Sequence, residues 1–154
     1  MSDKVRGALF NILGDIEGLA FLDAFAGSGA LAFEAASRGA KHVVAIEKDR
    51  AAHDIIDINA KELHLQDVVH VVRANTAGWS IHNMETNFDI VLLDPPYDDI
   101  QPLLIQKLIN RHVKKGGLTV LSYPGKAKVP EFEGVKIVEN KNYGDAQLIF
   151  YRKK

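Results

Sequence analysis

Cysteine is absent from the 154 residues, so the chain can form neither disulfide bonds nor thiolate metal sites, and it has no cysteine nucleophile. No apolar run approaches the roughly 20 residues that a membrane-spanning helix needs. The six histidines lie far apart, and no two of them have the i,i+4 spacing that is typical of metal ligands. We therefore expect a cytoplasmic protein that binds neither a metal nor a membrane.

The chain also lacks an excess of positive charge. Its 19 Lys and Arg residues are balanced by 20 Asp and Glu residues, which gives a formal net charge of -1 and a pI near 6.6. This is not the basic footprint of a protein that binds nucleic acid unaided, so the local basic groups are interpreted as solvated surface. The length and an ordinary hydrophobic content of 47% predict a single domain over residues 1–154.

Buried strands and helices are predicted to alternate along most of the chain. Runs rich in aliphatic residues predict five strands, and apolar residues at helical spacing predict the helices between them. The segment 77–86 has weak periodicity and is predicted as either a short helix or a loop. The predicted strands cover residues 19–26, 42–46, 68–73, 88–93 and 118–122, and the predicted helices cover residues 2–13, 30–38, 51–65 and 100–113.

The last part of the chain has a different pattern. Two further strands, 135–139 and 146–151, flank a turn signal at Tyr143-Gly144-Asp145 and predict a β-hairpin. Strands that alternate with helices form a parallel sheet covered on both faces, and a closing hairpin adds antiparallel pairing at one edge. We therefore predict a doubly wound α/β fold with a mostly parallel seven-stranded sheet and a C-terminal antiparallel hairpin.

Polar or glycine-rich segments follow four of the predicted strands. They are residues 23–29, Glu47, Asn75 and residues 94–97. In an open α/β sheet, ligands bind in the crevice outside the carboxyl ends of the strands. The convergence of four such segments on this edge indicates one binding site, and it is stronger evidence than any segment alone.

The turn from Gly27 to Gly29 allows two interpretations. With the following residues it satisfies the loose G-x-G-x-x-G/A pattern of dinucleotide binding, and Glu47 lies at a suitable distance to bind ribose hydroxyls. A nicotinamide enzyme is therefore one alternative, although Asp23 would oppose a pyrophosphate and could instead hold the ammonium of an amino acid. The other alternative is a tight turn that binds no ligand.

Glu47 and Asn75 each have a structural as well as a functional interpretation. A carboxylate at the end of the second strand can bind both hydroxyls of a ribose, but it can also be a solvated helix cap. The Asn75 amide, with Thr76 beside it, can bind an adenine edge, but Asn75 can also be an ordinary turn residue.

Asp94-Pro95-Pro96-Tyr97 directly follows the fourth strand. Proline fixes its own φ and holds the preceding residue extended, so this loop is stiff. It offers a carboxylate, a backbone carbonyl and an aromatic ring, which together suit a planar molecule with an exocyclic NH2 group. Hydrogen bonds from that group to Asp94 and to the Pro95 carbonyl would favour a pyramidal nitrogen with a free lone pair, while Tyr97 would stack on the ring.

The order D-x-F-x-G-S-G, an acidic end to the second strand, and D-P-P-Y resembles the class I S-adenosylmethionine-dependent methyltransferases. Within them the chain is similar to the RsmD-like family, bacterial enzymes that methylate the exocyclic N2 of a guanine in small-subunit ribosomal RNA. The similarity includes Ser2 to Leu13 at the start and Tyr143-Gly144 in the hairpin. It implies a Rossmann-like fold, S-adenosyl-L-methionine as cofactor with S-adenosylhomocysteine as product, and ribosomal RNA or the assembling small subunit as partner.

The resemblance also implies the roles of individual residues. The catalytic residues would be Asp94, Pro95, Pro96 and Tyr97, and the cofactor-binding residues would be Asp23, Phe25, Ala26, Gly27, Ser28, Gly29, Glu47, Lys48, Asn75 and Thr76.

The chain departs from the family pattern in three places. The basic segment that usually precedes the first helix is absent, and Asn75 stands where an aspartate is common. Ser122-Tyr123-Pro124 follows the fifth strand where many members have a glutamate. These departures keep other functions open. The same loop suits the N6 of a DNA adenine or a protein glutamine amide, and a non-catalytic, methyltransferase-like binding module is a further alternative.

Overall fold

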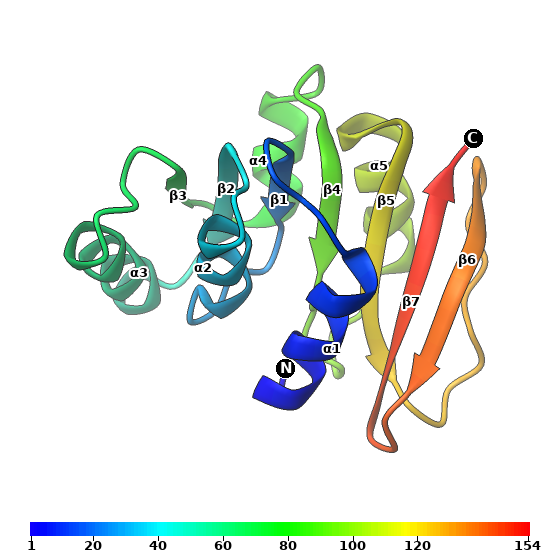
Figure 1. Ribbon diagram of the computed structural model, residues 1–154. Coiled ribbons are helices and arrows are strands. Elements are labelled where there is room, and N and C mark those ends of the chain that lie inside the picture. Colours follow the sequence, from blue (N-terminus) through cyan, green and yellow to red (C-terminus); the bar gives the residue numbers. More distant parts are fainter.

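The predicted alternation of strands and helices is present in the computed structural model, which describes residues 1–154 (Figure 1). The fold class is therefore confirmed. None of the helices is long and apolar enough to cross a membrane. The helices are α1 (Asp3–Leu13), α2 (Ala30–Ser37), α3 (Arg50–Glu62), α4 (Thr76–His82) and α5 (Pro102–His112). The strands are β1 (Ala20–Asp23), β2 (His42–Glu47), β3 (Val69–Arg73), β4 (Phe88–Leu93), β5 (Val113–Pro124), β6 (Val135–Asn142) and β7 (Ala146–Lys153).

All seven strands form one sheet in the order β3-β2-β1-β4-β5-β7-β6. The strands β1 to β5 pair in parallel, whereas β7 pairs antiparallel with both β5 and β6. The predicted hairpin thus closes one edge, with its second strand next to β5. The strand order reverses between β1 and β4, and a crevice forms at such a switch point because the adjacent helices lie on opposite faces.

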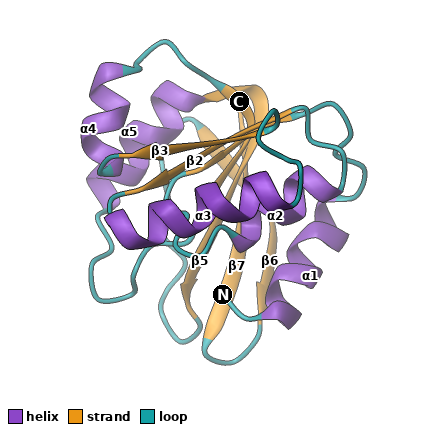
Figure 2. Cartoon of the chain, turned by 90° about the vertical axis from the view of Figure 1, so that its left-hand side faces the viewer, coloured by secondary structure: helices purple, strands orange, loops and turns teal.

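Helices cover both faces of the sheet, as Figures 1 and 2 show. One apolar cluster joins α1, α2 and α3 to the sheet, and a second joins α4 and α5 to its other face. Neighbouring strand residues alternate between these clusters. For example, Phe21 belongs to the first and Leu22 to the second, and both are fully buried. This alternation follows from the two-residue period of a strand.

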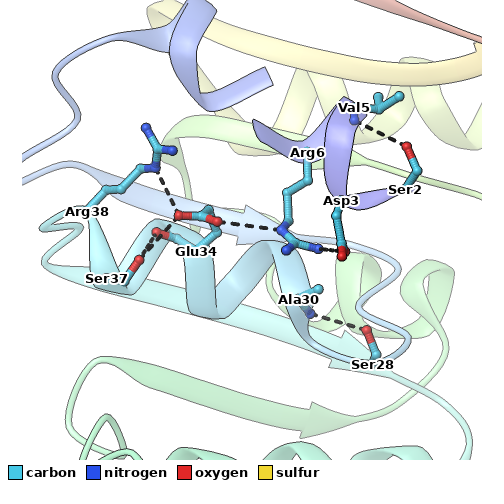
Figure 3. Close-up of polar contacts among 9 residues, drawn as sticks. All are labelled: Ser2, Asp3, Val5, Arg6, Ser28, Ala30, Glu34, Ser37 and Arg38. Carbon is cyan, nitrogen blue, oxygen red and sulfur yellow. Dashed lines mark hydrogen bonds and ion pairs between the residues drawn. The ribbon is translucent and has the colours of Figure 1, made fainter. Parts of the chain in front are cut away.

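Helix α1 is attached to α2 by charged side chains (Figure 3). Arg6 Nε lies 3.5 Å from Glu34 Oε1, and Arg38 Nε lies 3.0 Å from Glu34 Oε2. The hydrogen bond from Arg38 is the largest cause that lowers the pKa of Glu34. Arg38 also stacks over Phe10, with its guanidinium carbon 5.3 Å from the ring centroid. These contacts hold the first turn of α1, which Ser2 caps, beside the site described below.

The structure differs from the prediction around Gly116 and Gly117. These glycines were expected to precede the fifth strand, but β5 already begins at Val113 and contains both of them in a bulge. Gly116 has a positive φ of 79°, and a Cβ on Gly117 would lie 2.7 Å from the carbonyl oxygen of Asp89. The two glycines therefore permit an irregular strand where other residues would be strained or would clash.

The structure also decides one open prediction and corrects the end of one helix. The segment with weak periodicity forms the short helix α4, with Asn75 as its N-cap. Helix α3 ends at Glu62, before the predicted limit of 65, and His64 follows with a positive φ of 56°. A residue in the left-handed region cannot continue a right-handed helix, which explains the earlier end.

The side chain of Lys153 in β7 caps the end of α5. Its Nζ donates to the carbonyl oxygens of Ile109 and Asn110 at 3.1 Å and of Val113 at 2.8 Å. These carbonyls have no partner within the helix, and a cation there also interacts favourably with the helix dipole.

We expect the Lys153→Met substitution to lower the free energy of unfolding by about 1–3 kcal/mol, because hydrogen bonds to charged groups have this magnitude. Chemical denaturation would measure the change. The matched control is Lys154→Met, since the neighbouring side chain makes no hydrogen bond and should change stability by less than about 0.5 kcal/mol. Equal effects of the two substitutions would contradict the capping role of Lys153.

Candidate active site

An open cleft of about 900 Å³ lies at the carboxyl ends of β1 to β5. Most of the predicted site residues meet here, as expected for parallel strands whose ends share one edge. The predicted residues that line the cleft are Phe25, Gly27, Glu47, Lys48, Asn75, Thr76, Asp94, Pro95, Pro96 and Tyr97. The predicted residues that do not line it are Asp23, Ala26, Ser28 and Gly29.

Asp23 lies at the end of β1 and is fully buried. Neither of its carboxylate oxygens forms a hydrogen bond of good geometry, although the backbone N–H groups of Phe25 and Ala32 lie close enough to lower its pKa slightly. Burial, followed by the nearby charge of Asp94, raises the pKa of Asp23 from 3.8 to about 7. The next residue in the chain, Ala24, lines the cleft. Asp23 therefore lies behind the surface of the cleft and is not part of it.

The two glycines of the turn after β1 have different roles. Both need a positive φ, 56° at Gly27 and 85° at Gly29. A Cβ on Gly27 would meet no atom within 4 Å, so its backbone faces open space in the cleft. A Cβ on Gly29 would lie 2.9 Å from Phe33 and 3.1 Å from Ile56, so this glycine is required for packing between α2 and α3. Only Gly27 is placed for close approach to a ligand.

Glu47 at the end of β2 connects two turns. Its Oε1 accepts a hydrogen bond of 3.0 Å from the Gly27 backbone, and its Oε2 accepts one of 2.7 Å from the Asp49 backbone. The carboxylate is therefore fixed in place beside the glycine turn. Each oxygen keeps a lone pair that can accept a further hydrogen bond.

Asn75 and Thr76 each have a structural partner. Asn75 Oδ1 caps α4 by accepting a hydrogen bond of 2.6 Å from the Gly78 backbone, so the turn interpretation of this residue holds. The Asn75 amide nitrogen has no partner and remains able to donate to a ligand. The Thr76 hydroxyl donates to the Ala24 carbonyl and joins the start of α4 to the end of β1. Both residues nevertheless line the cleft.

The loop after β4 presents the acceptor groups that the sequence predicts. The Asp94 side chain is 22% exposed, and its Oδ2 lies 3.3 Å from the amino group of Met1. Pro95 is buried, and no protein group donates to its carbonyl oxygen. A turn follows, in which the Asp99 backbone donates to the Pro96 carbonyl at 3.0 Å. The loop is therefore rigid and leaves one carbonyl available to a substrate.

Tyr97 is fixed by a contact that the sequence did not predict. Its hydroxyl forms a hydrogen bond of 2.8 Å with Ser122 Oγ, while 43% of Tyr97 remains exposed. Ser122 is only 2% exposed. Burial raises the pKa of Tyr97, so the phenol keeps its proton at neutral pH. Ser122 therefore orients the aromatic ring beside Asp94.

Other lining residues were also missed in the sequence. Ser2 and Val5 come from the first turn of α1, and Tyr143 and Asp145 come from the hairpin turn. The hairpin residues reach the cleft because Ala146 of β7 pairs with Pro124 at the end of β5. The turn itself was predictable, but its position depends on the insertion of β7 next to β5.

The charged side chains that line the cleft are mainly acidic. They are the carboxylates of Glu47, Asp94, Asp99 and Asp145 and the amine of Lys48. Such a cleft favours a cationic ligand and repels phosphate groups. No group of three or more His, Cys, Asp or Glu side chains in the structure is arranged to hold a metal ion.

Comparisons with known proteins identify the family of the chain. The family model described as conserved hypothetical protein 95 matches residues 1–152. The protein named "Putative rRNA methyltransferase YlbH" from Bacillus subtilis is 32% identical over 160 residues, which cover 99% of this chain and 86% of that protein. Ribosomal RNA small subunit methyltransferase D from Buchnera aphidicola is 34% identical over 110 residues, which cover 71% of this chain and 56% of that protein.

A solved structure described as "Putative methyltransferase yhhF from Escherichia coli" superposes with a TM-score of 0.90. It is 29% identical in sequence, and the match covers 99% of this chain and 86% of that one. The predicted resemblance is thus confirmed by a family model, by curated relatives and by a solved structure. The chain belongs to the family described as conserved hypothetical protein 95, the RsmD-like methyltransferases.

Proposed function

We propose that the chain transfers a methyl group from S-adenosyl-L-methionine to the exocyclic N2 of a guanine in small-subunit ribosomal RNA. The observation that carries this proposal is a pair of acceptors on one loop beside Tyr97. They are the Asp94 carboxylate, whose Oδ2 lies 3.3 Å from the Met1 amino group, and the Pro95 carbonyl, to which no protein group donates. The names of the curated relatives support RNA as the substrate, because they describe ribosomal RNA methyltransferases.

The residues of the cleft fit S-adenosyl-L-methionine. This molecule carries positive charge on its sulfur and on its ammonium group, and Asp23, when ionised, would supply buried negative charge next to the cleft. Open space at Gly27 lets the ligand approach the backbone, and Glu47 can accept from ribose hydroxyls with its remaining lone pairs. Asn75 has a free amide nitrogen for the adenine. When bound, the cofactor supplies an electrophilic methyl group.

The Asp94 loop prepares the acceptor nitrogen. The amine of guanine is a poor nucleophile because its lone pair is delocalised into the ring. If Asp94 accepts one of its hydrogens and the Pro95 carbonyl accepts the other, the nitrogen becomes pyramidal and its lone pair turns out of the ring plane. Asp94 is also placed to take the proton that the nitrogen loses when the new bond to carbon forms. Correct orientation is the main contribution, so the stiffness of the two prolines matters.

Identification of the methylated nucleoside tests this function. The protein would be incubated with labelled S-adenosyl-L-methionine and, separately, with small ribosomal subunits, total RNA, genomic DNA and cell protein. We expect label in RNA as N2-methylguanosine, detected by mass spectrometry. Label only in DNA as N6-methyladenine, or only in protein as methylglutamine, would overturn the proposal. Binding of S-adenosylhomocysteine without any transfer would favour the non-catalytic module.

Ser122 is proposed as a positioning residue that acts through Tyr97. We expect Ser122→Ala and Tyr97→Phe each to lower kcat/KM for RNA by about 2- to 10-fold, mainly through KM, because each removes one neutral hydrogen bond. The double variant should be no worse than either single variant, since both remove the same contact.

Two further measurements separate this role from a general loss of structure. Ser122→Thr keeps the hydroxyl and should restore most of the activity, and the affinity for S-adenosylhomocysteine should stay unchanged in all variants. Additive losses in the double variant, or a failure of threonine to restore activity, would show that the contact between Ser122 and Tyr97 does not position the substrate.

A further inference from the structure

The near-neutral net charge hides a strong separation of charge along the chain. Residues 107–154 contain 11 of the 19 Lys and Arg residues but only four of the 20 Asp and Glu residues, which gives this segment a formal charge of +7. Residues 1–106 contain the remaining eight basic and 16 acidic residues and have a formal charge of -8. Charge asymmetry of this size between parts of a chain is typical of a protein with a polyanionic partner.

The sheet order turns this separation in sequence into a separation in space. The basic segment forms the end of α5 and the strands β5, β7 and β6, which are adjacent at one edge of the sheet. In Figure 1 these strands, coloured yellow to red, lie together on the right, away from β2 and β3. The molecule is therefore basic on the hairpin side and acidic on the side of β1 to β4.

Several basic side chains on the hairpin side are already engaged within the protein. Lys114 pairs with Asp89, Arg152 donates to the Gly116 carbonyl, and Lys153 caps α5. By contrast, Lys126 and Lys128 are exposed and make no hydrogen bond or ion pair. Exposed cations without partners are available to a ligand.

Lys126 and Lys128 follow the end of β5, next to the wall of the cleft. The Gly125 backbone donates to the Asp145 carbonyl at 3.0 Å, and the Asn142 side chain donates to the Gly125 carbonyl at 2.6 Å. These bonds join the start of the loop that carries Lys126 and Lys128 to the hairpin turn. Asp145 of that turn lines the cleft.

Lys141 belongs to the same corner of the molecule. It lies one residue before Asn142, near the end of β6, and is exposed. Its Nζ is 3.9 Å from Glu139 Oε1, at the limit of an ion pair, and pairs of this kind between exposed side chains contribute little. Asn142 faces the loop of Lys126 and Lys128, so Lys141, its neighbour in β6, points to the other face of the hairpin. The three lysines thus flank the end of the hairpin that borders the acidic cleft, and we call them the basic rim.

We propose that the rim formed by Lys126, Lys128 and Lys141 binds the phosphate backbone of an RNA strand while one base of that strand enters the cleft. The inference rests on the proposed function for the identity of the partner. The four carboxylates of the cleft repel phosphates, so the backbone has to be held outside the cleft, and the rim is an adjacent surface with free positive charge.

The test compares two triple variants that change the net charge equally. The first is Lys126→Gln, Lys128→Gln and Lys141→Gln. The matched control is Lys41→Gln, Arg50→Gln and Arg73→Gln, which removes three exposed basic side chains from the acidic part of the chain. Binding of a labelled single-stranded RNA of about 20 nucleotides is measured by fluorescence anisotropy between about 50 and 200 mM salt, with S-adenosylhomocysteine present.

We expect the rim variant to bind RNA at least about 10-fold more weakly at the lowest salt concentration. The slope of log affinity against log salt should fall by about 2, because each phosphate contact to a single strand contributes about 0.7. The control variant should change the slope little, and neither variant should change the affinity for S-adenosylhomocysteine measured by calorimetry.

Equal losses in the two triple variants, or no loss in the rim variant, would overturn the proposed surface. Tighter rim-dependent binding to duplex DNA of the same length would overturn RNA as its partner. An unchanged KM of the rim variant for ribosomal RNA would refute the surface and leave the proposed function intact. Rim-dependent RNA binding by a wild-type protein that methylates only DNA or protein would refute the function and retain the surface.

Discussion

Replacing Asp94 by alanine should lower kcat for methyl transfer by about 10²- to 10³-fold, the loss typical of removing one preorganised polar group from a transition state. The substitution leaves the amine with only the Pro95 carbonyl as acceptor, so one hydrogen is unpaired and the lone pair is not turned toward the methyl group. The remaining acceptor and the stacking ring of Tyr97 should still hold the base. We therefore expect kcat to fall far more than the affinity for RNA.

The affinity for S-adenosylhomocysteine, measured by calorimetry, separates the acceptor role of Asp94 from a role in cofactor binding. We expect the affinity for S-adenosylhomocysteine to change by less than about threefold, which corresponds to less than about 0.7 kcal/mol. Asp94→Asn serves as the isosteric control, since one of the two acceptor oxygens of the side chain is replaced by an NH2 donor. It should be impaired almost as strongly as the alanine variant. A comparable loss of cofactor affinity and of transfer would show that Asp94 serves the cofactor and not the acceptor.

Replacing Asp23 by asparagine should remove a pH-dependent loss of stability. The native pKa of about 7 lies above the ordinary 3.8, so both the folded and the unfolded carboxyl groups are protonated at low pH and the stability is then complete. As the pH rises above 3.8, the unfolded state releases the Asp23 proton first. The free energy of unfolding then falls steadily until the folded state also releases this proton, at a pH of about 7. At about 1.4 kcal/mol per pH unit the total penalty is up to roughly 4 kcal/mol.

Denaturation of both proteins between pH 4 and pH 8 measures this effect. The difference in unfolding free energy between Asp23→Asn and the wild type should change in favour of the variant by a few kcal/mol across this range, while contributions from other carboxylates cancel. At pH 8 the variant should also bind S-adenosyl-L-methionine, which has a cationic sulfur, more weakly than the wild type does. The loss of affinity for S-adenosylhomocysteine, whose sulfur is uncharged, should be smaller. A difference in stability that does not vary with pH would show that Asp23 is ionised throughout this range.

Much of the fold could be predicted because strand and helix periodicities are local properties of the sequence. The strand β4 and the start of α2 agree with the predicted limits, and polar residues after the strands marked the edge that carries the cleft. The bulge at Gly116 and Gly117 was not predictable, since a pair of glycines is compatible with both a loop and an irregular strand.

Site residues were predictable where a chemical group must face the crevice, and less so where two distant segments meet. The contact between Tyr97 and Ser122 depends on the pairing of β4 with β5 and spans 25 residues of sequence. At Ser122 the sequence shows only that the glutamate common in the family pattern is missing. The net charge of the whole chain was similarly uninformative about RNA, because it averages over the two oppositely charged parts that the sheet order separates.

The two oxygens of Glu47 accept hydrogen bonds from the backbone of two neighbouring turns, at Gly27 and at Asp49. The turns that would contact the cofactor are therefore held by bonds within the protein itself. Binding then has little backbone entropy to remove, so more of the contact energy is available as affinity, and association need not wait for a loop to close. A single carboxylate thus makes this side of the cleft a preformed receptor.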